Sequence, residues 1–188
     1  MKKSIIFLGL TGILFHGLYG TNVGQWSSAR MILAGNEAFG RDWIFKAPVN
    51  KNGLQLWQDE TEAALGILRN YVKNNKKNHT LLNDCILQIN NASYDLINGI
   101  KITYNNMFSP VGRKSITTAQ MRLEKKIQFR PLFDSIVDRM LDLKLKISVA
   151  RKKTKSVDLL AAYDIIDDIA QLIINTARKA AKSVDYLE

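Results

Sequence analysis

The stretch SVDLLAAYDIIDDIAQLIINTARKAAKSVDYL, residues 156–187, decides the fold class of this chain. Apolar side chains recur in it at intervals of three and four, the spacing of one face of an α-helix. Ser156 stands before the first apolar residue and is a favoured N-cap, so we predict that the last and longest helix begins there. The apolar face consists of Leu159, Leu160, Tyr163, Ile166, Ile169, Ala170, Ile173, Ala177, Ala181, Val184 and Leu187.

The same spacing predicts three helices in the first half of the chain. They cover residues 25–39, residues 54–72, and a segment that starts from an N-cap at Thr80 and ends near residue 107. Residues 40–53 contain Pro48 and glycines, so we expect a connecting loop there. A second break is expected at residues 109–112, where serine, proline and glycine cluster.

The segment 113–155 is harder to divide. Thr117 or Thr118 is predicted to cap a weak, very basic helix that ends near Phe129. Pro131 fits best in the first turn of a new helix, because its missing N–H would be unpaired there in any case. A kinked helix that continues through Pro131 also fits the pattern.

Amphipathic helices joined by short turns can bury their apolar faces only against one another. No stretch shows the sustained alternation of a half-buried strand. We therefore predict an all-α fold: a single domain, residues 21–188, built as an antiparallel bundle of five to six amphipathic helices.

Residues 1–20 have the layout of a secretory signal peptide. Lys2 and Lys3 precede an apolar run from Ile5 to Phe15, and Gly20 is the expected cleavage position. Leu18 is larger than the cleavage rule prefers, so an uncleaved N-terminal anchor is the alternative. Either way we expect an exported protein that is secreted, periplasmic or on the cell surface.

The composition disfavours several kinds of catalytic site. The two histidines are His16, inside the expected signal peptide, and His79, which we expect in a solvated turn. Multi-histidine metal sites and Ser-His-Asp triads are therefore not supported. Cys85, the single cysteine, falls on an apolar helix face and is expected to be a buried core residue. No glycine-rich nucleotide loop occurs, and we predict no enzyme activity, no cofactor and no metal.

Aspartates form two groups on predicted helices. Asp134, Asp138 and Asp142 recur at intervals of four and so share a helix face. Asp164, Asp167 and Asp168 form the second group. We interpret both as solvated or salt-bridged faces, because a calcium site needs ligands that converge from a loop.

Positive charge is concentrated in one third of the chain. The net charge is +10, and between Arg113 and Lys155 thirteen lysines and arginines face only four acids. A surface of this kind attracts anionic partners. The candidate binding residues are Arg113, Lys114, Arg122, Lys125, Lys126, Arg130, Arg151, Lys152, Lys153 and Lys155.

These features favour an exported, non-enzymatic, surface- or virulence-associated binding module whose basic face binds a macromolecular partner, for example a host or envelope component. A protein or an acidic polysaccharide is the expected partner, and a membrane surface is an open alternative. Nucleic acid is disfavoured because the basic helix lacks interleaved aromatic side chains for base stacking. A self-assembling, homo-oligomeric envelope protein is the second hypothesis. A helical enzyme or small-ligand carrier with a pocket near Trp26, Trp43 and Trp57 is the third.

Overall fold

A computed structural model describes residues 51–74 and 79–185. The expected signal peptide, residues 1–20, and the predicted helix at residues 25–39 lie outside the described residues. Within the described ranges every regular element is helical, which confirms the all-α fold class. None of the described helices is both long enough and apolar enough to cross a membrane.

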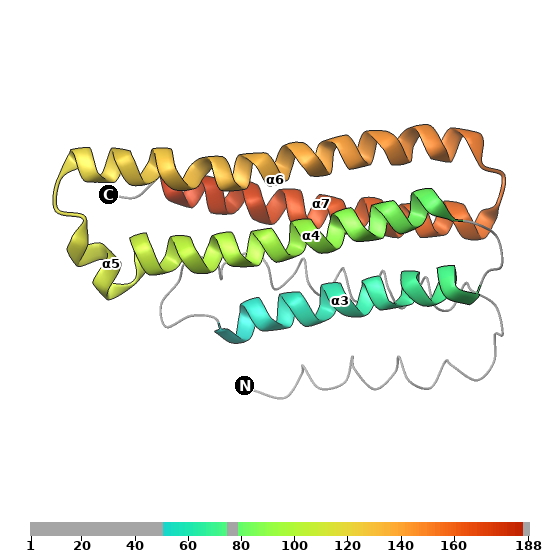
Figure 1. Ribbon diagram of the computed structural model, residues 1–188, viewed down its shortest axis with the longest axis horizontal. Coiled ribbons are helices and arrows are strands. Elements are labelled where there is room, and N and C mark those ends of the chain that lie inside the picture. Colours follow the sequence, from blue (N-terminus) through green and yellow to red (C-terminus); the bar gives the residue numbers. More distant parts are fainter. Residues whose placement is uncertain (1–50, 75–78, 186–188) are drawn as a thin grey trace, which may run out of the picture.

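Four long helices lie side by side and alternate in direction along the chain, as Figure 1 shows. The packing of α6 against α7 is the most extensive, α4 contacts both of them, and α3 packs mainly on α4. The elements are α3 (Lys51–Asn74), α4 (Thr80–Thr103), the π-helical turn η2 (Tyr104–Phe108), α5 (Pro110–Ser115), α6 (Ala119–Lys153) and α7 (Val157–Asp185). This arrangement is the predicted antiparallel bundle.

Side-chain caps fix where two of the long helices begin. The Thr118 hydroxyl accepts a hydrogen bond from the Met121 N–H at 3.2 Å, and the Ser156 hydroxyl accepts one from the Leu159 N–H at 3.4 Å. Both positions were predicted as N-caps from their residue types. Such a cap satisfies one of the N–H groups that the first turn of a helix leaves unpaired.

The starts of two other helices differ from the prediction. α3 begins at Lys51, three residues inside the expected loop. α4 has His79 as its N-cap, and Thr80 is its first helical residue. The His79 carbonyl accepts the first helical hydrogen bond, from the Asn83 N–H at 2.9 Å. His79 is half-buried, with its ring 5.5 Å from that of Tyr71, so the expectation of a solvated turn residue was wrong.

The prediction of a new helix at Pro131 was also wrong, and the alternative of one continuous segment is correct. α6 runs for 35 residues with Pro131 inside it, so α6 and not α7 is the longest helix. Proline leaves the carbonyl four residues earlier, that of Ile127, without its usual partner. Both Pro131 and Ile127 are exposed, so water can reach that carbonyl, while Phe129 and Phe133 anchor the opposite face in the core.

Replacing Pro131 with alanine should therefore stabilise the protein, because an interior helical hydrogen bond becomes available on the exposed face. We expect the free energy of unfolding to rise by about 1–3 kcal/mol, measured by urea denaturation followed by circular dichroism. Gln128→Ala, at an exposed position of the same helix, is the control and should change stability by less than about 0.5 kcal/mol. A lower denaturation midpoint for Pro131→Ala would contradict this explanation.

Candidate functional site

A tight reversal after α4 brings α5 back against the end of the bundle. The Ser109 hydroxyl donates to the Asn105 carbonyl at 2.8 Å and accepts from the Gly112 N–H at 3.0 Å. The Ser115 hydroxyl donates to the Gly112 carbonyl at 2.6 Å. The cluster predicted only as a break is therefore a capped helical turn, with proline in the first turn of α5.

Gly112 is required at this reversal because the chain passes too close for a side chain. A Cβ atom at Gly112 would lie 2.6 Å from the carbonyl oxygen of Asn105. Real Cβ atoms do not approach backbone atoms so closely, so α5 would have to move away from η2. The position of the charges carried by α5 thus depends on this glycine.

Gly112→Ala should lower the free energy of unfolding by about 1–3 kcal/mol, since the added methyl group overpacks against backbone that cannot rotate away. Gly66→Ala is the matched control: Gly66 lies within α3 and its added Cβ would meet nothing within 4 Å. That control should stabilise the protein by about 0.5–1 kcal/mol. Equal effects of the two substitutions in urea denaturation would refute the close-packed reversal.

Polar contacts along the α6–α7 pair fix its register. Arg130 bonds to Asp185 at 2.8 Å, and Lys144 bonds to Gln171 at 2.9 Å. Near the far end of α6, Arg151 pairs with Asp164 at 2.6 Å. Each step forward along α6 is matched by an equal step back along α7, as antiparallel helices require. Because Arg130 already lies opposite Asp185, the last described residue of α7, residues 119–126 extend beyond it (Figure 1).

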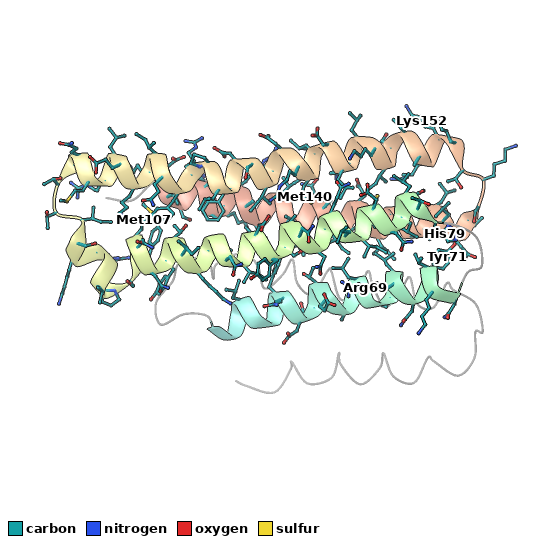
Figure 2. All side chains as sticks on the ribbon, viewed as in Figure 1. Arg69, Tyr71, His79, Met107, Met140 and Lys152 are labelled. Atoms are coloured by element: carbon teal, nitrogen blue, oxygen red, sulfur yellow. The ribbon has the colours of Figure 1, made fainter. Side chains whose placement is uncertain are left out.

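Five of the predicted binding residues gather at this extension, on α5 and the first turns of α6. We call them the cationic end: Arg113, Lys114, Arg122, Lys125 and Lys126. Glu124 is the single acid in the sequence between Asp95 and Asp134. Charge of one sign is therefore crowded here, on the short helix α5 and the first turns of α6, which the turn at residues 116–118 joins. Met107, labelled in Figure 2, marks this end of the bundle.

Most of the cationic end is uncompensated. Among the described residues, the side chains of Arg113, Lys114, Arg122 and Lys126 form no ion pair with a carboxylate. Lys125 lies 5.5 Å over the ring of Phe129, a cation–π contact that leaves its positive charge in place. Arg113 and Lys114 are exposed, whereas the three α6 residues are half-buried. Half-buried cations without counterions attract an external anion more strongly than fully solvated ones.

Arg130 belongs to the scaffold and not to this group. Its guanidinium bonds to Asp185 of α7 and, at 3.3 Å, to Asp134 of its own helix. The negative charge of Asp185, followed by the hydrogen bond that Arg130 donates to Asp134, raises the pKa of Arg130 above its usual range. Sequence spacing placed Arg130 on the same face as Arg122 and Lys126, but it could not show these counterions.

The remaining candidates lie at the opposite end of α6. Arg151 is paired with Asp164, and Lys152, Lys153 and Lys155 are exposed around the turn into α7. About 26 residues of continuous helix, or about 39 Å, separate Lys126 from Lys152. Apart from Arg130, the structure therefore divides the predicted residues into two groups, five at one end of the bundle and four at the other.

The aspartates behave as structural partners or as exposed surface. Asp164 and Asp167 pair with Arg151 and Lys144 on α6, the latter at 3.1 Å. Asp134 pairs with Arg130, in line with the predicted salt-bridged faces. Within residues 51–74 and 79–185, no group of three or more His, Cys, Asp or Glu side chains could hold a metal ion.

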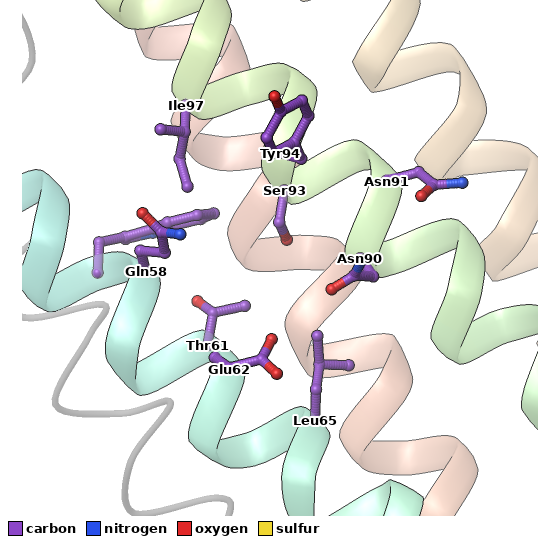
Figure 3. Close-up of a pocket in the computed structure, with 10 residues that line it drawn as sticks. Gln58, Thr61, Glu62, Leu65, Asn90, Asn91, Ser93, Tyr94 and Ile97 are labelled. Carbon is purple, nitrogen blue, oxygen red and sulfur yellow. The ribbon is translucent and has the colours of Figure 1, made fainter.

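A small hollow lies between α3 and α4. Figure 3 shows polar groups from both helices at its rim, among them Glu62 of α3 and Asn90 of α4. Arg69 bonds to both of these side chains and so joins the two helices. The volume is about 140 Å³, and Trp57, a buried core residue, forms part of the lining. Ligand pockets usually measure about 300–1,000 Å³, so this hollow is small for a cofactor. Trp26 and Trp43 lie outside the described residues.

Cys85 is fully buried in the core, as its position on the apolar face predicted. Burial, followed by the nearby charge of Asp84, raises the pKa of its thiol from 9.0 to about 11. Burial, followed by the charge of Asp158, raises the pKa of Tyr71. Burial, followed by interactions with Cys85 and Tyr71, raises the pKa of Tyr163. A protonated, inaccessible thiol is not a nucleophile at neutral pH.

The raised pKa of Cys85 makes stability depend on alkaline pH. The unfolded chain loses the thiol proton near pH 9 and the folded chain near pH 11, so the free energy of unfolding should fall as the pH rises between these values. Tyr71 and Tyr163 shift in the same direction and add to the fall. Urea denaturation across this range measures the slope, and Cys85→Ala should make it shallower. A slope unchanged by Cys85→Ala would contradict the assignment.

No family model, curated protein or solved structure matches this chain.

Proposed function

We propose that this protein is an exported, non-enzymatic binding module and that its cationic end binds an acidic polysaccharide or another polyanionic macromolecule. The observation that carries the proposal is the set of four cationic side chains, Arg113, Lys114, Arg122 and Lys126, that lack ion pairs among the described residues. They come from two helices that meet at one end of the bundle. Export is supported by the sequence pattern of residues 1–20.

The form of this surface suits an extended polymer better than a compact ligand. Its charges project from a short helix and from the neighbouring turns of α6, and none of them lines the hollow between α3 and α4. A polymer with regularly spaced carboxylates or sulfates can satisfy such an array one group at a time. Each contact is screened by salt, so binding should weaken steeply as ionic strength rises.

Binding to immobilised heparin, a sulfated polysaccharide, tests this proposal. The triple variant Lys114→Gln/Arg122→Gln/Lys126→Gln should bind on the order of tenfold more weakly, which corresponds to about 1.4 kcal/mol, and should elute at lower salt. The control is Lys73→Gln/Lys153→Gln/Lys155→Gln, which removes the same charge from the other end of the bundle (Figure 1). We expect it to retain most of the wild-type affinity.

Two results would contradict the proposal. If the wild-type protein passes through the column at low salt, the surface does not bind polyanions. If both triple variants lose affinity equally, binding follows net charge and the cationic end is not a site. Circular dichroism melts of each variant separate loss of binding from loss of fold.

A further inference from the structure

The outward face of α6 carries a second row of apolar side chains, opposite the row that enters the core. Leu141 is 44% exposed, Leu145 67% and Val149 47%. The inward face of the same helix is buried: Phe133, Met140, Leu143 and Ile147 contribute to it. Figure 2 shows Met140 toward the interior and Lys152 on the outer side of α6. An apolar patch of this kind on a surface helix indicates a contact with another molecule.

Charged residues stand at both ends of this row. The outward positions recur at intervals of four, three, four, three and four, the spacing of a coiled-coil seam. They are, in order, Asp134, Asp138, Leu141, Leu145, Ser148 and Lys152, all of them exposed. The row thus begins with two acids, continues with two leucines and ends with a base.

We propose that this face binds the same face of a second copy of the chain, with the two α6 helices antiparallel. A two-fold axis at the level of Leu143 places Leu141 opposite the partner's Leu145. The same register places Asp134 opposite the partner's Lys152. Every contact then occurs twice, as a symmetric dimer requires.

A parallel arrangement has no such complementarity. In register it places Asp134 and Asp138 against the same acids of the second copy, and Lys152 against another lysine, which is repulsive. The order of acid, leucine and base is thus self-complementary in the antiparallel sense alone. The row from Asp134 to Lys152 is about 27 Å long, which gives an interface at the small end of the usual range. The dimer is accordingly weak and depends on concentration.

Analytical ultracentrifugation of the purified protein, taken into the high micromolar range, tests the proposal. We expect a reversible monomer–dimer equilibrium in the wild type. Leu145→Glu should weaken self-association on the order of tenfold or more, because a charge enters the apolar centre of the interface. The matched control is Leu87→Glu, at an outward position of α4 that is 57% exposed, and it should leave the equilibrium unchanged.

A charge exchange tests the antiparallel register. Asp134→Lys alone brings two lysines together at each symmetric contact, and Lys152→Asp alone brings two acids together, so each variant should self-associate more weakly than the wild type. Mixing the two variants restores opposite charges at both contacts and should restore dimers. Both positions are exposed, and the bond of Asp134 to Arg130 is an exposed ion pair, so each change should alter stability by less than about 1 kcal/mol.

Several results would overturn the proposal. These are a strictly monomeric wild type, equal responses to Leu145→Glu and Leu87→Glu, an oligomer insensitive to Leu145→Glu, or a mixture of charge variants that stays monomeric. None of them depends on the heparin experiment, so the two proposals stand or fall separately.

Discussion

The antiparallel packing of α6 against α7 determines where every other feature of this protein lies. Apolar side chains from both helices form the centre of the core, and ion pairs at Arg130, Lys144 and Arg151 lock the two helices in one register. Each of these pairs is partly or largely exposed, so the ionic contacts select the alignment while burial of the apolar faces supplies most of the stability. The register leaves residues 119–126 beyond Asp185, and the cationic end is a consequence of that offset.

α6 has apolar residues on two sides of the helix. The inward row meets α7 and α4, and the outward row meets no other described helix. A bundle stabilised only by its inward rows has no need of Leu141 or Leu145 at exposed positions. Their exposure must reduce solubility somewhat, so their presence is best explained by a contact made outside the single chain.

Periodicity predicted the bundle well because helical spacing survives small errors in boundaries. Eight residues of the predicted apolar face of α7 are buried, but Ile165, Leu172 and Ile174 are buried as well, so the buried side of this helix is wider than its spacing predicted. The caps at Thr118 and Ser156 were correct. The error at Pro131 had a larger effect. Dividing α6 there hid its length, and with it the separation of Lys126 from Lys152 and the outward row of leucines. Counterions such as Asp185 for Arg130 are distant in sequence, so spacing alone could not identify them.

The position of the cationic end also limits the number of polymer-binding surfaces that one molecule has. Among the described residues a single copy presents one such surface, at one end of the bundle, and through it would bind a polymer at one point. Two copies joined about Leu143 would carry these surfaces on opposite tips, with Lys126 about 50 Å from the partner's Lys126. That geometry favours bridging between two separate polymer chains over the binding of both surfaces to one short polymer segment. Clustering of the polymer, and not tighter binding of a fragment, would then be the signature of the pair.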